Sequence, residues 1–271
     1  MNEIVLTSEA EFYLDTAVPN KARIFDYLLD GTFNFKADRV AAQKIIQLIP
    51  SLPKWIRLRR AFIQEAAFTL YKNGFKQFLD LGSGMPTENH LHIAVPKARI
   101  IYSDTNPVAV SYGQSLFAEF VNIDYIYGDF GQIQHLLQNP AVRRTIDRQE
   151  KTAIGLNMLP LTLNQSEIGR LYQELYRWAP FGSQIFQVIQ TRSQQAQSKK
   201  YEQLLALSQE FRCPMYIYPL DKALALSEPW QPREVVPLTQ FLGLPDAYLN
   251  EADQEGMGIS FYAAFLTRGD A

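Results

Sequence analysis

The sequence has little of what would mark a secreted, membrane-bound or nucleic-acid-binding protein. Its single cysteine, Cys213, cannot form an internal disulfide, and no apolar run approaches the length of a signal region or a transmembrane helix. We therefore expect a cytoplasmic protein without membrane association. The 26 basic and 28 acidic residues give a net charge of −2, so bulk electrostatics do not favour a nucleic-acid partner.

Histidines are also scarce, since the chain has only three. His90 and His92 are two positions apart, which does not place two ligands on one helical face, and no nearby cysteine or trio of acids completes a metal site. No Ser-His-Asp arrangement or nucleophile-elbow sequence is recognisable. We therefore expect no bound metal ion and no catalytic triad.

What the chain does have is a core-forming composition with 47% hydrophobic residues, enough for one large α/β unit. Residues 1–74 carry apolar side chains three and four positions apart, which predicts an N-terminal helical cap or lid. Residues 75–192 alternate short apolar strands with helical stretches, which predicts a mostly parallel sheet. Beyond them we expect a helix near 201–210 and strands at 214–218 and 258–267, the last an antiparallel closing strand. Residues 75–271 form the core unit in this interpretation.

The segment from Phe78 to Gly84 is the most informative, because a buried strand pattern leads there into a glycine turn. Gly82 and Gly84 permit positive φ and a close approach to a ligand, while Asp80 offers a carboxylate. Thr87 follows instead of the third small residue of a dinucleotide fingerprint, which disfavours a nicotinamide cofactor. S-adenosylmethionine fits better, with Thr87 capping the next helix. An ordinary turn without a ligand is the alternative.

Two more acids follow later strand patterns. Asp104 ends the pattern at 98–103, about two dozen residues after Asp80, which is the length of one β-α-β unit, and a carboxylate there suits ribose hydroxyls. The alternative is that Asp104 only caps a helix starting near Pro107. Asp129 follows the pattern at 124–127 and could accept from an adenine amino group, although Gly-Asp is also a common turn. Further strands are expected from residue 153 and at 183–189.

The loop and the N-terminal segment together resemble the S-adenosyl methyltransferase family that long stood as a domain of unknown function. The resemblance rests on Pro86 and Thr87 after the glycine turn, on His92, and on residues 22–39, which follow the family's opening motif almost residue for residue. It implies a Rossmann-like class I methyltransferase fold with S-adenosylmethionine as cofactor. A histidine common in the family is replaced by Pro160, which supplies neither proton transfer nor a hydrogen-bond donor.

The N-terminal segment mixes charged, amide and aromatic side chains, from which we expect a lid over the cofactor. In this hypothesis Tyr27 attracts the sulfonium through its ring and Arg23 pairs with the methionine carboxylate. The alternative is that Tyr27 is core packing and Arg23 a surface charge. We interpret a nearby basic cluster as a solvated helix face: Lys54, Arg57, Arg59 and Arg60.

The residues that we predict to bind the cofactor are Asp80, Gly82, Ser83, Gly84, Thr87, Asp104, Thr105, Asn106, Asp129, Phe130, Asn157, Arg23, Tyr27 and Asn34. Methyl transfer from a sulfonium is a direct displacement whose leaving thioether needs no proton, so little catalytic machinery is expected. We predict transfer to an oxygen or nitrogen atom of a small-molecule acceptor. The candidate bases near the cofactor are His92, His90, Tyr27 and Asp38. The alternatives are a cofactor-binding sensing or partner-binding module without turnover, and a nicotinamide-dependent oxidoreductase.

Overall fold

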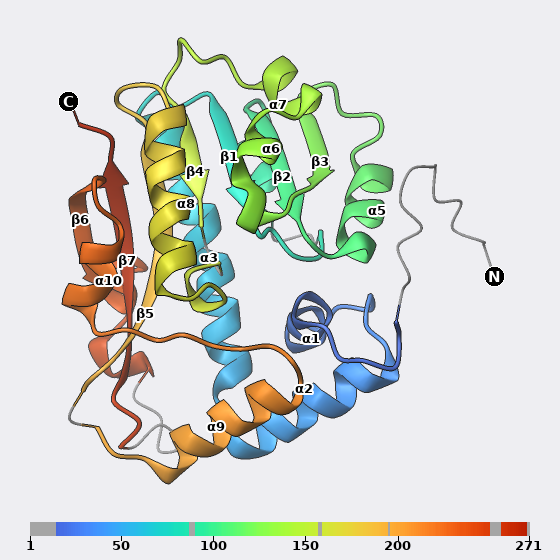
Figure 1. Cartoon of the computed structure of the whole chain (residues 1–271), viewed down its shortest axis with the longest axis vertical. Coiled ribbons are helices and arrows are strands. Elements are labelled where there is room, and N and C mark those ends of the chain that lie inside the picture. Colours follow the sequence, from blue (N-terminus) through green and yellow to red (C-terminus); the bar gives the residue numbers. More distant parts are fainter. Residues whose placement is uncertain (1–14, 87–89, 157–158, 195, 250–255, 270–271) are drawn as a thin grey trace.

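The computed structural model describes residues 15–86, 90–156, 159–194, 196–249 and 256–269, which fold around one seven-stranded sheet (Figure 1). The strands are β1 (Gln77–Leu81), β2 (Arg99–Asp104), β3 (Ile123–Tyr127), β4 (Ala153–Gly155), β5 (Gln184–Arg192), β6 (Gln231–Pro237) and β7 (Ile259–Thr267). Their order is β3-β2-β1-β4-β5-β7-β6, parallel from β3 to β5, with β7 antiparallel to both of its neighbours. The predicted Rossmann-like sheet with an antiparallel closing strand is confirmed.

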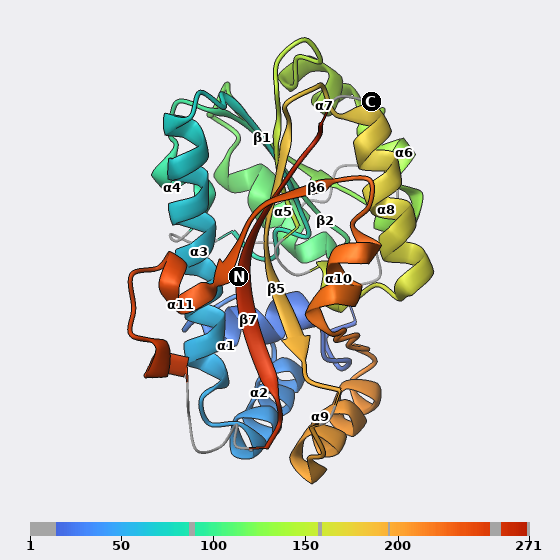
Figure 2. The ribbon, with the colours of Figure 1, turned by 90° about the vertical axis from the view of Figure 1, so that its left-hand side faces the viewer.

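Helices cover both faces of this sheet and pack together at one end of the molecule (Figure 1). They are α1 (Lys21–Leu28), α2 (Lys36–Leu48), α3 (Leu52–Lys72), α4 (Leu91–Ala94), α5 (Pro107–Leu116), α6 (Ile133–Leu137), α7 (Pro140–Thr145), α8 (Gln165–Trp178), α9 (Lys199–Glu210), α10 (Leu220–Leu226) and α11 (Leu238–Phe241). Successive strand residues face opposite sides, so Phe78 joins a core with α3 and α5, whereas Leu79 joins a core with α6 and α8. Figure 2, seen along the sheet, has α3 and α8 on opposite sides.

The helix α3 belongs to the main core although it precedes the first strand. Phe62 is fully buried on it, and its ring centroid lies 5.3 Å from that of Phe241 and 6.0 Å from that of Phe265. The predicted division of the chain at residue 74 stays a prediction.

Two helices from the N-terminal segment and one from the C-terminal part pack together at one end of the molecule. Ile24 and Leu28 of α1 share a buried apolar cluster with Ala42 of α2 and with Phe211, the residue after α9. Figure 1 shows α9 lying along α2, and the Lys44 ammonium of α2 contacts the carboxylate of Glu210 at 2.7 Å. We name α1, α2 and α9 the three-helix cluster. The sequence pattern did not connect α9 with the N-terminal helices.

The C-terminal part differs most from the sequence-based expectation. The helix predicted at 201–210 is confirmed within α9, but the strand predicted at 214–218 is wrong, because only Tyr218 makes an isolated bridge, to Thr191. The sixth strand is β6 instead, which contains Pro232 and Pro237. Proline cannot donate to a ladder and is tolerated at a sheet edge, which is where β6 lies.

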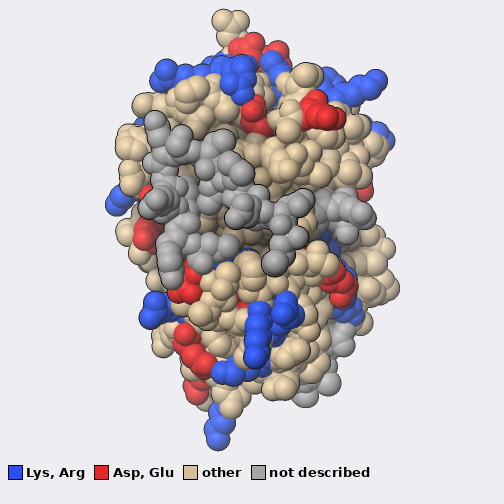
Figure 3. All heavy atoms as spheres, turned by 90° about the vertical axis from the view of Figure 1, so that its right-hand side faces the viewer, with Lys and Arg blue, Asp and Glu red and all other residues tan. Residues whose placement is uncertain are grey.

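Within the described ranges, no helix is long and apolar enough for a membrane crossing. The face of the molecule drawn in Figure 3 carries Lys and Arg side chains interspersed with Asp and Glu.

Candidate functional site

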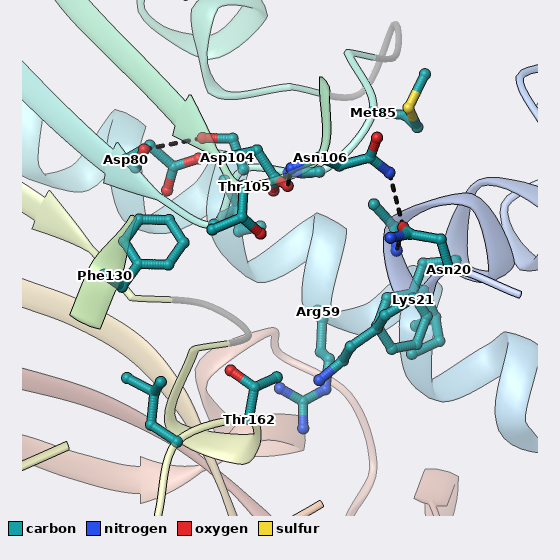
Figure 4. A pocket seen from close by; sticks show the side chains of 18 of the residues that line it. Asn20, Lys21, Arg59, Asp80, Met85, Asp104, Thr105, Asn106, Phe130 and Thr162 are labelled. Atoms are coloured by element: carbon teal, nitrogen blue, oxygen red, sulfur yellow. Dashed lines mark hydrogen bonds between the residues drawn. The ribbon is translucent and has the colours of Figure 1, made fainter. Parts of the chain in front are cut away.

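A cavity of about 300 Å³ lies at the carboxyl ends of β1, β2 and β3, with α1 forming its opposite wall. The strand order reverses between β1 and β4, and open α/β sheets bind ligands beside such a reversal. In Figure 4, Asp80, Asp104 and Phe130 lie on one side of this cavity and Asn20 and Lys21 on the other. The predicted residues that line it are Asp80, Gly82, Ser83, Gly84, Asp104, Thr105, Asn106, Asp129 and Phe130.

The glycine turn after β1 is shaped by its own hydrogen bonds. Gly82 and Gly84 adopt φ values of 70° and 72°, in the left-handed region that favours glycine. The backbone N–H groups of Gly82 and Ser83 both donate to the carbonyl of Ser103 at 2.9 Å. The Ser83 hydroxyl donates to the carbonyl of Asp80 at 2.9 Å. These hydrogen bonds hold the turn against β2, and the backbone of the turn forms part of the cavity wall.

Asp104 connects the glycine turn to the helix α5. One carboxylate oxygen accepts from the Gly84 N–H and the other from the Asn106 N–H, each at 2.8 Å. Asn106 is itself the N-cap of α5, because its side-chain oxygen accepts from the Val108 N–H at 2.9 Å. The alternative that Asp104 only caps this helix is therefore wrong. Burial raises the pKa of Asp104, and its hydrogen bonds from backbone N–H groups oppose that rise.

Asp80 and Arg60 both line the cavity near the end of β1. Asp80 is buried at the end of β1, and its charge raises the pKa of Arg60 against the larger lowering effect of burial. The Nη1 of Arg60 is buried with no hydrogen-bond partner among the described residues, and Nη2 reaches the Met85 carbonyl at 3.5 Å. A Cβ added to Gly84 would lie 3.7 Å from this Nη2. Arg60 thus presents an unused donor beside the glycine turn.

Asp129 and Phe130 close the far end of the cavity. One oxygen of Asp129 accepts from the Gly131 N–H at 2.9 Å and the other from the Gln132 amide at 3.2 Å. Asp129 therefore caps the 3-10 turn η1 (Phe130–Gln132) and also lines the cavity, so its place in a turn does not exclude contact with a ligand. The ring of Phe130 is buried next to it.

Arg23 and Asp38 form a buried pair that does not line the cavity. The Arg23 Nε lies 2.8 Å from a carboxylate oxygen of Asp38, with side-chain exposures of 4% and 0%, and another Arg23 nitrogen donates to the Val18 carbonyl. The alternative of a surface charge for Arg23 is therefore wrong. Asp38 also accepts from the Asn20 N–H at 2.8 Å. The side chain of Asn20 accepts from the Asn106 amide at 2.7 Å, which connects the start of α1 to the loop after β2 (Figure 4).

Tyr27 and Asn34 also lie outside the cavity wall. The Tyr27 hydroxyl accepts from the Gln43 amide at 3.4 Å, and the Tyr27 ring packs in the three-helix cluster. The Asn34 amide donates to Asp26 and to the Gly31 carbonyl, both at 2.8 Å. Their predicted contacts with a cofactor stay predictions. Thr87 and Asn157, also predicted to bind the cofactor, lie outside the described residues.

The two candidate histidines lie behind the glycine turn rather than in the cavity wall. His90 Nε2 lies 3.2 Å from the Ser83 carbonyl, and burial holds the pKa of His90 well below its usual range. His92 Nδ1 lies 3.1 Å from the Tyr102 hydroxyl, and burial lowers its pKa as well. Their proposed roles as bases stay predictions, as does that of Asp38.

Lys21 and Arg59 line the cavity without having been predicted there. The Lys21 Nζ is buried with no hydrogen-bond partner among the described residues, and burial lowers the pKa of Lys21 to about 8. Arg59 is 3% exposed and donates to Gln190 at 2.7 Å. The interpretation of the basic cluster on α3 as a solvated face is therefore wrong for Arg59, and also for Arg60, whose buried Nη1 belongs to the cavity wall. The sequence pattern did indicate that Arg59 is buried, because Arg59 lies three residues after Ile56 and four before Ile63, within an apolar helical stripe.

Residues 7–236 match the protein family described as S-adenosyl methyltransferase. No curated protein matches the sequence. A structure described as a candidate methyltransferase from Thermobifida fusca YX is 25% identical, with a TM-score of 0.82 over 94% of this chain and 97% of its own. A DUF574 family protein from Streptomyces avermitilis is 23% identical, with a TM-score of 0.81 over 94% and 99%. Geranyl diphosphate C-methyltransferase from Streptomyces coelicolor is 14% identical, with a TM-score of 0.54 over 84% and 85%. The last two likenesses show the fold alone.

Proposed function

This chain belongs to the S-adenosyl methyltransferase family, and we propose that it transfers a methyl group to an oxygen or nitrogen atom of a small-molecule acceptor. The cofactor is S-adenosylmethionine, as the family implies. The observation that carries the proposal is the convergence of the family-matched glycine turn and three strand-end acids on one cavity.

The residues of the cavity fit the parts of this cofactor. Asp104 would hold the ribose hydroxyls, because a carboxylate can accept from both, and Asp129 with Phe130 would contact the adenine. Asp80 would accept from the methionine amino group. We assign the methionine carboxylate to Arg60 rather than to Arg23, because Arg60 has an unused buried donor whereas Arg23 is engaged with Asp38 and a backbone carbonyl.

Methyl transfer requires the protein mainly to bind the cofactor and the acceptor and to orient them. The sulfonium supplies an activated methyl group, and its leaving thioether takes no proton. The wall that α1 contributes, from Asn20 to Leu29, would exclude water from the acceptor and hold it in line. The Asn20–Asn106 hydrogen bond and the buried Arg23–Asp38 pair fix that wall against the sheet. In this proposal Arg23 and Asp38 position the site without touching the cofactor.

A second candidate is a module that binds the cofactor without turnover. Pro160, in the 3-10 turn η2 (Leu159–Leu161), stands where the resemblance places a histidine. Among the described residues that line the cavity there is no histidine at all. This pattern favours the second candidate only for an acceptor that requires an imidazole base.

Two measurements test the proposal. Isothermal calorimetry with S-adenosylhomocysteine tests the cofactor site, and incubation with methyl-labelled S-adenosylmethionine and a fractionated metabolite extract tests turnover. Binding together with a labelled small molecule supports the enzyme, whereas binding with no labelled product in any fraction supports the module. Asp104→Asn should weaken S-adenosylhomocysteine binding and lower the amount of labelled product, and Asp221→Asn, on the exposed side of α10, is the matched control. If the unaltered protein does not bind S-adenosylhomocysteine, both candidates fail.

A further inference from the structure

A second cavity, of about 80 Å³, adjoins the first between the three-helix cluster and α3. Its wall includes Leu28 of α1, Ile45 of α2, Trp55 of α3 and Leu204 of α9. The two cavities share four wall residues, which therefore mark where the spaces meet: Lys21, Phe25, Ile56 and Arg59.

The second cavity is predominantly apolar away from that junction. Its apolar wall residues are Ile24, Phe25, Leu28, Ile45, Leu52, Trp55, Ile56, Leu161, Leu204, Leu207, Phe211 and Met215. Two of its polar side chains already have partners, because the Ser208 hydroxyl donates to the Leu205 carbonyl and Gln190 accepts from Arg59. A space with this lining favours a hydrocarbon group.

The junction, in contrast, carries two buried positive charges. Figure 4 shows the Lys21 amine beside the Arg59 guanidinium. Burial and, after it, the charge of Arg59 disfavour the protonated form of Lys21, whereas Cys213 and Asp104 favour it without forming a hydrogen bond to Nζ. Two like charges out of water, one of them with no hydrogen-bond partner, are costly unless an anion lies between them. A carboxylate would accept charge-assisted hydrogen bonds from both.

We propose that the methyl acceptor is a small apolar carboxylic acid, with its carboxylate at Lys21 and Arg59 and its hydrocarbon part in the second cavity. A carboxylate oxygen attacks the methyl carbon, so a C–O bond forms, the S–CH3 bond breaks, and the products are a methyl ester and a neutral thioether, with no proton transferred. This inference rests on the proposed function, because the same junction opens into the cofactor cavity. The second cavity, of about 80 Å³, is smaller than the roughly 150 Å³ cavity that accommodates benzene, which limits the hydrocarbon part to a short chain.

The first experiment compares three probes by calorimetry on the purified protein saturated with S-adenosylhomocysteine. Hexanoate has both the charge and the chain, hexanamide has the chain without the charge, and acetate has the charge without the chain. We expect hexanoate to bind at least about tenfold more tightly than either comparison compound. Equal affinities for hexanoate and hexanamide, with S-adenosylhomocysteine bound, would overturn the inference and leave the proposed function intact. Failure to bind S-adenosylhomocysteine would remove the proposed function itself.

Variants then separate the acceptor from the cofactor. Lys21→Met should weaken hexanoate by at least about tenfold and change S-adenosylhomocysteine affinity by less than about twofold. Lys222→Met is the matched control, because Lys222 is exposed on α10 and lines neither cavity. If Lys21→Met instead weakens S-adenosylhomocysteine by about tenfold or more, Lys21 holds the cofactor and the inference is wrong.

A second variant tests the apolar part independently of the charge. Ser208→Leu adds a branched side chain to the wall of the second cavity. We expect it to weaken hexanoate by at least about tenfold and to leave acetate and S-adenosylhomocysteine within about twofold. Circular dichroism of both variants confirms that they fold. Unchanged hexanoate affinity in folded Ser208→Leu would contradict occupation of this cavity.

Discussion

Replacing Lys21 by methionine should make the ligand-free protein more stable. Burial lowers the pKa of Lys21 from 10.5 to about 8, so the folded state holds this proton less tightly than the unfolded chain. Between these two pKa values the unfolded chain binds more protons, and the destabilising contribution of Lys21 falls as the pH rises. The shift in the pKa of Lys21 lowers the free energy of unfolding by about 3 kcal/mol at about pH 6.5 and by about 1 kcal/mol at about pH 9.5. Methionine has a similar length and no charge.

Urea unfolding of both proteins at these two pH values measures the effect. We expect the variant to be more stable by about 3 kcal/mol at about pH 6.5, with the advantage falling to about 1 kcal/mol at about pH 9.5. Comparing the unfolding free energies of the two proteins at the same pH cancels the contributions of groups that titrate alike in both. The charged or titratable neighbours that act on Lys21 are Arg59, Asp104 and Cys213. A variant no more stable than the unaltered protein at the lower pH, or an advantage independent of pH, would refute the reasoning.

Three further predictions concern the cofactor site and the core. Asp104→Asn should weaken S-adenosylhomocysteine by about 1 to 3 kcal/mol in calorimetry, because a buried acceptor is lost; an unchanged affinity would exclude the ribose role. Arg60→Met should weaken S-adenosylhomocysteine by about 1 to 3 kcal/mol while leaving adenosine, which lacks the carboxylate, unaffected. Equal losses for both ligands would contradict the assignment of the carboxylate. Phe62→Ala should lower the unfolding free energy by about 3 to 5 kcal/mol in urea titration, since a fully buried ring is removed; a loss below about 1 kcal/mol would show that α3 is not core.

The strand-end acids could be predicted because their positions follow from local pattern. Asp80, Asp104 and Asp129 each follow a short apolar run, and parallel strands bring their carboxyl ends to one edge of the sheet. The glycine turn was equally readable from Gly82 and Gly84. Part of the candidate site could therefore be predicted without knowledge of the tertiary contacts.

The positions of the arginines and the second cavity depend on contacts that a single sequence does not encode locally. Arg23 and Arg60 both lie on helices, but only the packing of α1 on α2 gives Arg23 the buried partner Asp38, and only the rotation of α3 directs Arg60 to the glycine turn. The second cavity needs α9, which reaches α2 across the contact between Lys44 and Glu210. Strand β6 was missed because Pro232 interrupts its pattern, and edge position tolerates that residue.

A crystal structure of the protein grown with S-adenosylhomocysteine would show directly whether the cavity beside the glycine turn holds the cofactor. We expect the ligand in the cavity between α1 and the strand ends, with its ribose hydroxyls on Asp104, its adenine against Phe130 and its carboxylate on Arg60. A ligand bound elsewhere, or in this cavity with its ribose away from Asp104, would contradict it.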